Sequence, residues 1–264
     1  MRVFYSQLLA ICAFQAWGAI AFIVSPGAQT RPRKPSFSLH STVSEGEKSN
    51  WDLSGISNSI LRCEGQSRKT FDFRDLSKEV VQLGMTTEGR PLEAEIQLWI
   101  GPDWVPFKVK VFSEDGRTFP VQSLIGTRKK SAQVEVRNAG PLTLPFTAAC
   151  SYAKPPLSEI RDIIPQTEEA RRVQGAGAVY SFPLEQTDKG QARVFLKTDT
   201  RQLNARVELL NGPNNVKQKF EVFTNNGVLN SLYVVFETPG TGYTIRIINL
   251  APVEFPAYAF IKQL

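Results

Sequence analysis

Hydrophobic and polar residues alternate with a period of two along much of the chain after residue 70, which is typical of β-strands with one face in water. Residues 108–111 (Lys-Val-Lys-Val) show the alternation most clearly, and turn residues such as Gly101-Pro102-Asp103 separate the alternating runs. No helix-length segment lies between the runs, so we expect antiparallel strands. The strands are predicted at residues 70–73, 79–83, 94–100, 106–113, 119–126, 131–138 and 146–153, and again at 179–184, 192–197, 205–210, 217–224, 229–237, 242–249 and 257–262.

These two sets of strands are copies of one sequence. Residues 94–116 and 205–227 both contain a strand, a Gly-Pro turn, a second strand with Val-Phe, and a turn closed by glycine. The offset of 111 residues holds without a gap over residues 71–150, where roughly a quarter of positions are identical. The repeated structural motif consists of Gly101, Pro102, Gly116, Asn138 and Pro145 in the first copy and Gly212, Pro213, Gly227, Asn249 and Pro256 in the second.

The repeat predicts an all-β protein with two tandem homologous antiparallel β-sandwich domains, because each copy has about seven short strands. We place the domains at residues 70–153 and 179–264, which suits a chain of 264 residues. The linker, residues 154–178, combines isoleucines with charged residues and is expected to contain a short helix that Pro165 ends. Residues 45–69 are predicted to form an N-terminal arm.

Residues 1–44 have the composition of a two-part targeting leader. Arg2 precedes an apolar stretch that ends in Ala19-Ile20-Ala21, a cleavage pattern typical of signal peptides. The following segment is rich in Ser and Thr and has no acid before Glu45, as transit peptides do. We expect delivery to a plastid, with simple secretion as the alternative. No later stretch reaches the roughly 18 apolar residues of a membrane span, so no span is expected in the mature protein.

Charge does not favour nucleic acid as a partner. The formal net charge is +6, but residues 1–44 contain four basic residues and no acidic ones. The body therefore has 27 basic and 25 acidic side chains, and these are interspersed. A nucleic-acid interface would need a basic face on the folded part of the protein.

The residues that usually carry catalysis are missing or poorly placed. The only histidine, His40, lies in the leader, so the mature chain has no imidazole for a general base or a metal ligand. Glu114-Asp115 corresponds to Asn225-Asn226 in the second copy, which favours a turn over catalysis. We therefore predict no enzyme, no metal and no cofactor. Cys63 and Cys150 are interpreted as candidate free thiols and not as a disulfide framework.

Three aromatic residues are candidates for contacts between copies of the protein. Trp104 and Phe107 correspond to polar residues, Asn215 and Gln218, in the second copy, so the shared core does not obviously need them. They are predicted to form a contact made by the first domain only, with burial in the core as the alternative. Trp99 corresponds to Leu210 and is either a core residue or part of the same contact.

Residues 98–106 (Leu-Trp-Ile-Gly-Pro-Asp-Trp-Val-Pro) and 109–116 (Val-Lys-Val-Phe-Ser-Glu-Asp-Gly) resemble the repeated segments of diatom pyrenoid shell proteins. Residues 136–140 and 144–146, with their counterparts in the second copy, are also similar. The second copy departs most, with Asn214 in place of Asp and no Trp. The resemblance implies a plastid protein at the pyrenoid periphery that assembles with itself into a sheet or tube around the Rubisco matrix, with Rubisco matrix proteins as further partners.

Two other functions stay open at this point. A tandem β-sandwich that binds carbohydrate or protein would need exposed aromatic residues at matching places in both copies, and we expect the second copy to lack them. An enzyme that works through carboxylates alone, as glycosidases do, would need a suitable pair of acids, and no such pair is shared by the copies.

Overall fold

The computed structural model describes residues 60–153, 170–185 and 190–263. Within these ranges the chain is all-β, with sixteen strands and no helix, which confirms the all-β part of the predicted fold class. The described residues include no helix that is long and apolar enough to cross a membrane. The predicted leader and the predicted linker helix lie outside the described residues.

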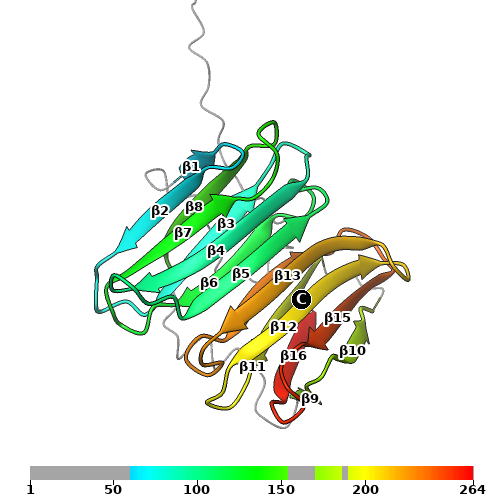
Figure 1. Ribbon diagram of the computed structural model, residues 1–264. Coiled ribbons are helices and arrows are strands. Elements are labelled where there is room, and N and C mark those ends of the chain that lie inside the picture. Colours follow the sequence, from blue (N-terminus) through cyan, green and yellow to red (C-terminus); the bar gives the residue numbers. More distant parts are fainter. Residues whose placement is uncertain (1–59, 154–169, 186–189, 264) are drawn as a thin grey trace, which may run out of the picture. The chain divides into compact units, whose positions relative to one another are not determined.

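The strands form two antiparallel sheets of eight strands each, which we call sheet A and sheet B. Figure 1 looks onto sheet B, with sheet A behind it. Sheet A has the order β1 (Ile60–Cys63), β8 (Phe146–Tyr152), β3 (Val80–Thr86), β6 (Val121–Gly126), β14 (Leu232–Glu237), β11 (Gln191–Lys197), β16 (Ala257–Gln263) and β9 (Arg171–Val173). Sheet B has the order β10 (Ala178–Pro183), β15 (Tyr243–Asn249), β12 (Leu203–Asn211), β13 (Val216–Thr224), β5 (Phe107–Ser113), β4 (Leu92–Ile100), β7 (Ala132–Asn138) and β2 (Arg68–Phe73).

The sequence repeat is visible strand by strand. Strand β3 corresponds to β11, β4 to β12, β6 to β14, β7 to β15 and β8 to β16, with bounds displaced by 111 residues. The correspondence extends to β1 and β9, which lie in the expected arm and linker respectively. Each structural copy therefore begins earlier than the sequence pattern indicated, because a strand of three or four residues is too short to show alternation.

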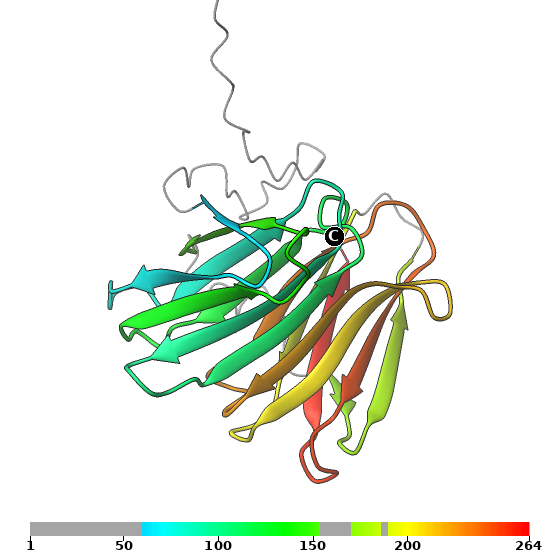
Figure 2. The same cartoon turned by 45° about the horizontal axis from the view of Figure 1, so that its top comes forward.

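The structure does not show the two separate sandwich domains that the sequence predicts, because both sheets run through both copies. Strand β5 pairs with β13 in sheet B, and β6 pairs with β14 in sheet A. Figure 2 shows strands of the two copies following one another across the sheets. Inward side chains of both sheets and both copies form one hydrophobic core. A separate copy would leave the edges of β5 and β6 unpaired, and their pairing across the seam satisfies those backbone groups.

A local two-fold relation passes through both seams. Lys110 lies opposite its own counterpart Glu221 in the β5–β13 pair, and Ser123 lies opposite its counterpart Val234 in the β6–β14 pair. Opposite charges at directly paired positions stabilise a sheet, whereas like charges destabilise it. A seam between two first copies would place Lys beside Lys, and one between two second copies would place Glu beside Glu. The divergence of Lys110 and Glu221 thus favours the seam that the chain forms.

Candidate assembly surfaces

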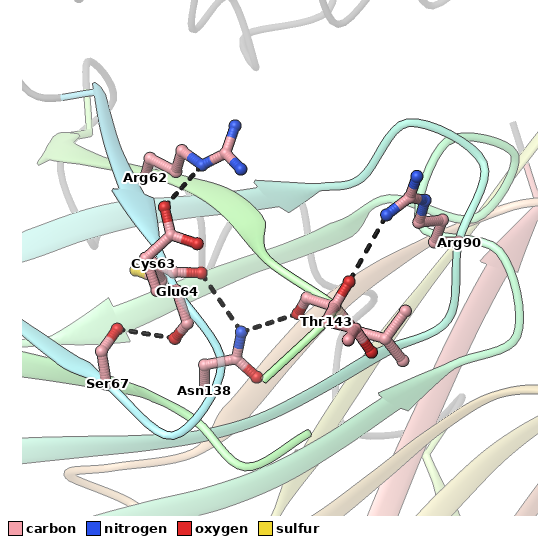
Figure 3. Close-up of polar contacts among 8 residues, drawn as sticks. Arg62, Cys63, Glu64, Ser67, Arg90, Asn138 and Thr143 are labelled. Atoms are coloured by element: carbon pink, nitrogen blue, oxygen red, sulfur yellow. Dashed lines mark hydrogen bonds and ion pairs between the residues drawn. The ribbon is translucent and has the colours of Figure 1, made fainter. Parts of the chain in front are cut away.

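Asn138 and Asn249 attach the short edge strands of sheet A. Asn138 is fully buried, and its Nδ2 donates to the backbone carbonyls of Cys63 at 3.2 Å and Leu144 at 2.9 Å. Its Oδ1 accepts from the N–H of Gly140 at 2.9 Å. Figure 3 shows this amide between the end of β1 and the loop that contains Thr143. The motif asparagine is therefore a structural residue that holds β1 in place.

The second copy repeats this arrangement. Asn249 Nδ2 donates to the carbonyls of Val173 at 3.0 Å and Phe255 at 2.9 Å, and its Oδ1 accepts from the N–H of Ala251. Val173 belongs to β9, which corresponds to β1. The following prolines of the motif, Pro145 and Pro256, are half-buried and immediately precede β8 and β16.

Gly116 and Gly227 are required by close packing against a threonine. A Cβ atom at Gly116 would lie 2.7 Å from Oγ1 of Thr87, and one at Gly227 would lie 2.2 Å from Oγ1 of Thr198. Gly116 donates its N–H to the carbonyl of Arg90 at 3.0 Å, and Gly227 donates its N–H to the carbonyl of the equivalent Arg201 at 2.8 Å. These contacts explain why both copies keep glycine at this position.

The Gly-Pro turns follow β4 and β12. Gly101 and Gly212 have φ angles of +71° and +86°, a region that favours glycine. Each turn is closed by a backbone hydrogen bond, from Ile100 to Trp104 in the first copy and from Asn211 to Asn215 in the second. The adjacent prolines, Pro102 and Pro213, are exposed.

Asp115 and Asn226 make equivalent turns, as the sequence predicted. Asp115 Oδ1 accepts from the N–H groups of Arg117 and Thr118, and Asn226 Oδ1 accepts from the two corresponding N–H groups. Burial opposes ionisation of Asp115, but the hydrogen bonds from Thr118 and Arg117 outweigh it and lower the pKa. A carboxylate that is kept ionised by hydrogen bonds within its own turn stabilises the turn and is poorly suited to proton transfer at neutral pH.

The structure places the three candidate aromatic residues in different environments. Trp104 is partly exposed, at 38%, and the Arg128 guanidinium lies over its ring with its carbon 4.8 Å from the ring centroid. Arg128 also donates to Asn230 of the second copy, whose Nδ2 donates to Gly126. Trp104 therefore contributes to the contact between the two copies. The second copy has Pro239 at the position of Arg128, so a Trp at its position 215 would have no equivalent arginine to pack against.

Phe107 packs in the core, where it is 1% exposed and among the largest fully buried side chains. Phe107 cannot contact a neighbouring molecule, so of the two interpretations of this residue the structure supports burial in the core. Its counterpart Gln218 is also buried, and its Nε2 donates to the carbonyls of Phe119 and Pro120. The aromatic-to-polar difference was misleading because a buried amide with partners can occupy a core position.

Trp99 lies on the outward face of β4 and is half-buried, opposite Gln133 of β7. Its indole N–H is buried and has no partner among the described residues. Trp99 is thus neither in the central core nor fully exposed, and it stays a candidate contact residue.

Two further aromatic residues on the outward face of sheet B were missed by the sequence analysis. Phe112 and its counterpart Phe223 lie opposite Lys219 and Lys108 across the β5–β13 seam. Phe223 is 42% exposed and Phe112 is half-buried. The four-residue offset between them along the strands separates them by about 14 Å. The sequence could have indicated this position, because residues 108, 110 and 112 lie on the same face of a strand and Lys108 and Lys110 face the solvent.

The outward face of sheet A differs sharply from that of sheet B. It contains a second apolar cluster that includes Val80, Tyr233 and Val235, all buried. Glu237 lies in the same sheet and accepts hydrogen bonds from Gln122 and Gln191. Because Val80, Tyr233 and Val235 are buried in the folded chain, these three side chains are not available for assembly.

Replacing Glu237 by Gln should make the stability of the folded protein less sensitive to rising pH. Burial raises the pKa of Glu237 above 4.5, although the amides of Gln191 and Gln122 oppose that change. A carboxyl with a raised pKa binds its proton more tightly in the folded state, so stability falls as pH rises through this window. We expect the Tm of Glu237→Gln to exceed that of the wild type by a margin that grows as the pH rises from the ordinary pKa of a glutamate through the raised pKa of Glu237. A constant margin across that range would contradict the assignment.

The remaining chemistry of the described residues is sparse. Cys63 and Cys150 are buried and free, as expected, and burial raises the pKa of Cys63 to about 11. A thiol with so high a pKa is a poor nucleophile at neutral pH. Among residues 60–153, 170–185 and 190–263, no three His, Cys, Asp or Glu side chains are grouped to hold a metal ion.

The fold defines an all-β protein built from a sequence repeat, with two sheets that run through both copies. Its motif residues hold strands and turns in place. A comparison with family models identifies the family: residues 53–263 match the diatom pyrenoid shell protein family. The chain belongs to this family, which confirms the resemblance noted in the sequence. Membership implies a location at the pyrenoid and a structural role in place of an enzymatic one. A comparison with curated proteins gave no match.

Proposed function

We propose that this protein assembles with itself into a sheet-like shell at the periphery of the pyrenoid in the plastid stroma. The shell encloses the Rubisco matrix and thereby supports CO2 concentration and fixation. In this proposal the leader, residues 1–44, directs the protein to the plastid, and Rubisco matrix proteins are further partners. Membership of the pyrenoid shell family supports the location.

The observation that carries self-assembly is that both sheets end in strands with no second neighbour among the described residues. Sheet B ends in β2 and β10, and sheet A ends in β1 and β9. Strands β1 and β2 contact each other, as do β9 and β10, so the two ends of the sandwich each present two strand edges. Unpaired edges offer hydrogen-bond donors and acceptors to another chain. A molecule with two such ends can form an open array, whereas a single self-complementary contact closes as a dimer.

The purified protein should form sheets or tubes as its concentration rises, measured by light scattering and electron microscopy. In the alga, a fluorescent fusion should form a ring around the pyrenoid. A protein that stays monomeric at high concentration, or a fusion spread evenly through the stroma, would contradict the proposal.

A carbohydrate- or protein-binding module is the second candidate, because Phe112 and Phe223 are aromatic residues at matching places in both copies. Such pairs can stack on a sugar or pack on a protein. If this function holds, the double variant Phe112→Ser, Phe223→Ser should lose binding to insoluble glucan, while Val179→Ser, which alters an exposed apolar residue elsewhere, should keep it. Self-assembly without glucan binding favours the shell.

A further inference from the structure

We propose that two copies of this protein pair through their β2 strands, about a two-fold axis at Thr70, in a continuous antiparallel ladder. The inference rests on the proposed self-assembly and names one of its contacts. Strand β2 forms one end of sheet B (Figure 1), and β7 is its only partner strand among the described residues.

The free backbone groups of β2 can be identified from its hydrogen bonds to β7. The N–H of Asn138 donates to the carbonyl of Ser67 at 2.8 Å, whereas the N–H of the next residue, Ala139, donates to the carbonyl of Glu93 in β4 at 3.0 Å. Backbone groups in an antiparallel pair alternate between the two sides of a strand. Residues 67, 69, 71 and 73 therefore point their N–H and C=O groups at β7. Arg68, Thr70 and Asp72 point theirs outward, where a second strand can pair with them.

The side chains of these three residues favour a second copy of β2 as the occupant. All three are exposed on the outward face of sheet B. In an antiparallel pair centred on Thr70, Arg68 of each copy lies opposite Asp72 of the other, and the two threonines face each other. Opposite charges at directly paired positions stabilise such a pair, and two-fold symmetry gives this contact twice.

Existing contacts leave these side chains able to change partner. The Arg68 side chain is 74% exposed and its Nη1 lies 3.8 Å from Oε2 of Glu135, a weak exposed pair. Asp72 accepts one hydrogen bond, on Oδ1, from Gln133 at 2.7 Å. Its other oxygen is available to the partner's arginine.

Strand β10, at the opposite end of sheet B, does not suit this role as well. The N–H of Leu184 donates to Tyr243, so by the same alternation Val179, Ser181 and Pro183 face outward. Pro183 has no N–H to donate, and proline at an edge weakens pairing. A β2–β10 contact would also place Arg68 opposite Pro183 and Asp72 opposite Val179, with no charge complementarity.

The seam inside the molecule provides a precedent. Strands β5 and β13 are equivalent edges that pair antiparallel about a local two-fold axis, with Lys110 opposite Glu221 at its centre. The β2–β2 contact repeats this mode of pairing between molecules.

Charge reversal tests the contact through mixing. Arg68→Asp places two aspartates opposite each other in a β2–β2 pair, and Asp72→Arg places two arginines opposite each other. Each single variant should weaken the contact about ten-fold or more in sedimentation velocity. An equimolar mixture of the two variants should restore it, because each variant then carries the charges that the other needs. The double variant Arg68→Asp, Asp72→Arg should also restore it.

The matched control is Val179→Asp, which adds a charge at the position on β10 that corresponds to Arg68. It should leave the contact between β2 strands unchanged. All variants are exposed-surface changes, and an unchanged Tm shows that they fold. Loss of the contact in Val179→Asp, or failure of the mixture to restore it, would overturn this inference. If the wild type assembles and the single variants assemble equally well, the β2–β2 contact is wrong but the proposed shell stands. If the wild type does not assemble at all, both proposals are wrong.

Discussion

Replacing Phe107 by alanine should lower the free energy of unfolding by about 3–5 kcal/mol, the usual cost of removing a buried phenylalanine. Phe107 is 1% exposed, so its removal leaves a cavity in the core that both copies share. Denaturant unfolding, followed by fluorescence or circular dichroism, would measure the change through the transition midpoint.

Trp104→Ala is the matched control for this experiment. Trp104 lies in the loop just before β5, the strand that Phe107 begins, but it is 38% exposed and the Arg128 guanidinium lies over its ring. We expect a loss of about 1 kcal/mol, the typical strength of an exposed cation–π contact with some lost packing. Equal losses for the two variants, or the larger loss for Trp104, would show that the burial assigned to Phe107 is incorrect.

Asn138→Ala should destabilise the protein by about 2–4 kcal/mol and release β1 from sheet A. The substitution leaves the carbonyls of Cys63 and Leu144 and the N–H of Gly140 without their partner, and each buried polar group left unpaired costs about 1–3 kcal/mol. Hydrogen exchange should accelerate at Ile60–Cys63 more than at the centre of sheet A.

Two further variants make the Asn138 experiment specific. Asn249→Ala should produce the same loss but accelerate exchange at β9, because its amide holds Val173. Asn211→Ala removes an asparagine whose Nδ2 donates an exposed hydrogen bond to the carbonyl of Thr241, and it should change stability little. If Asn138→Ala accelerates exchange across the whole sheet equally, β1 is not a locally anchored strand.

The seam explains why the two copies can differ so much in sequence. Positions at the seam lie next to each other, so a change in one copy is matched by its neighbour in the other. Lys110 faces Glu221, and Arg128 bridges Trp104 and Asn230. At these positions the difference between the copies coincides with a contact between them. The proposed β2–β2 pair would extend the same principle to contacts between molecules.

The amino-acid sequence alone determined the repeat, the all-β class, most strands and the Asx turns at Asp115 and Asn226. These features depend on residues close together in the chain: period-two alternation, Gly-Pro turns and amide or acidic side chains that bond to nearby N–H groups. The family resemblance also rested on short local segments, and the match over residues 53–263 confirmed it.

Tertiary structure decided which strand edges meet, and no local pattern encodes that choice. The pairing of β5 with β13 turned two expected sandwiches into one, because each edge found its complement in the other copy of the chain. The same level of structure buried Phe107 and Gln218 together, exposed Phe223, and gave Asn138 its role in holding β1. Alternation says which side chains share a face; only the packed sheets decide whether that face or edge is covered.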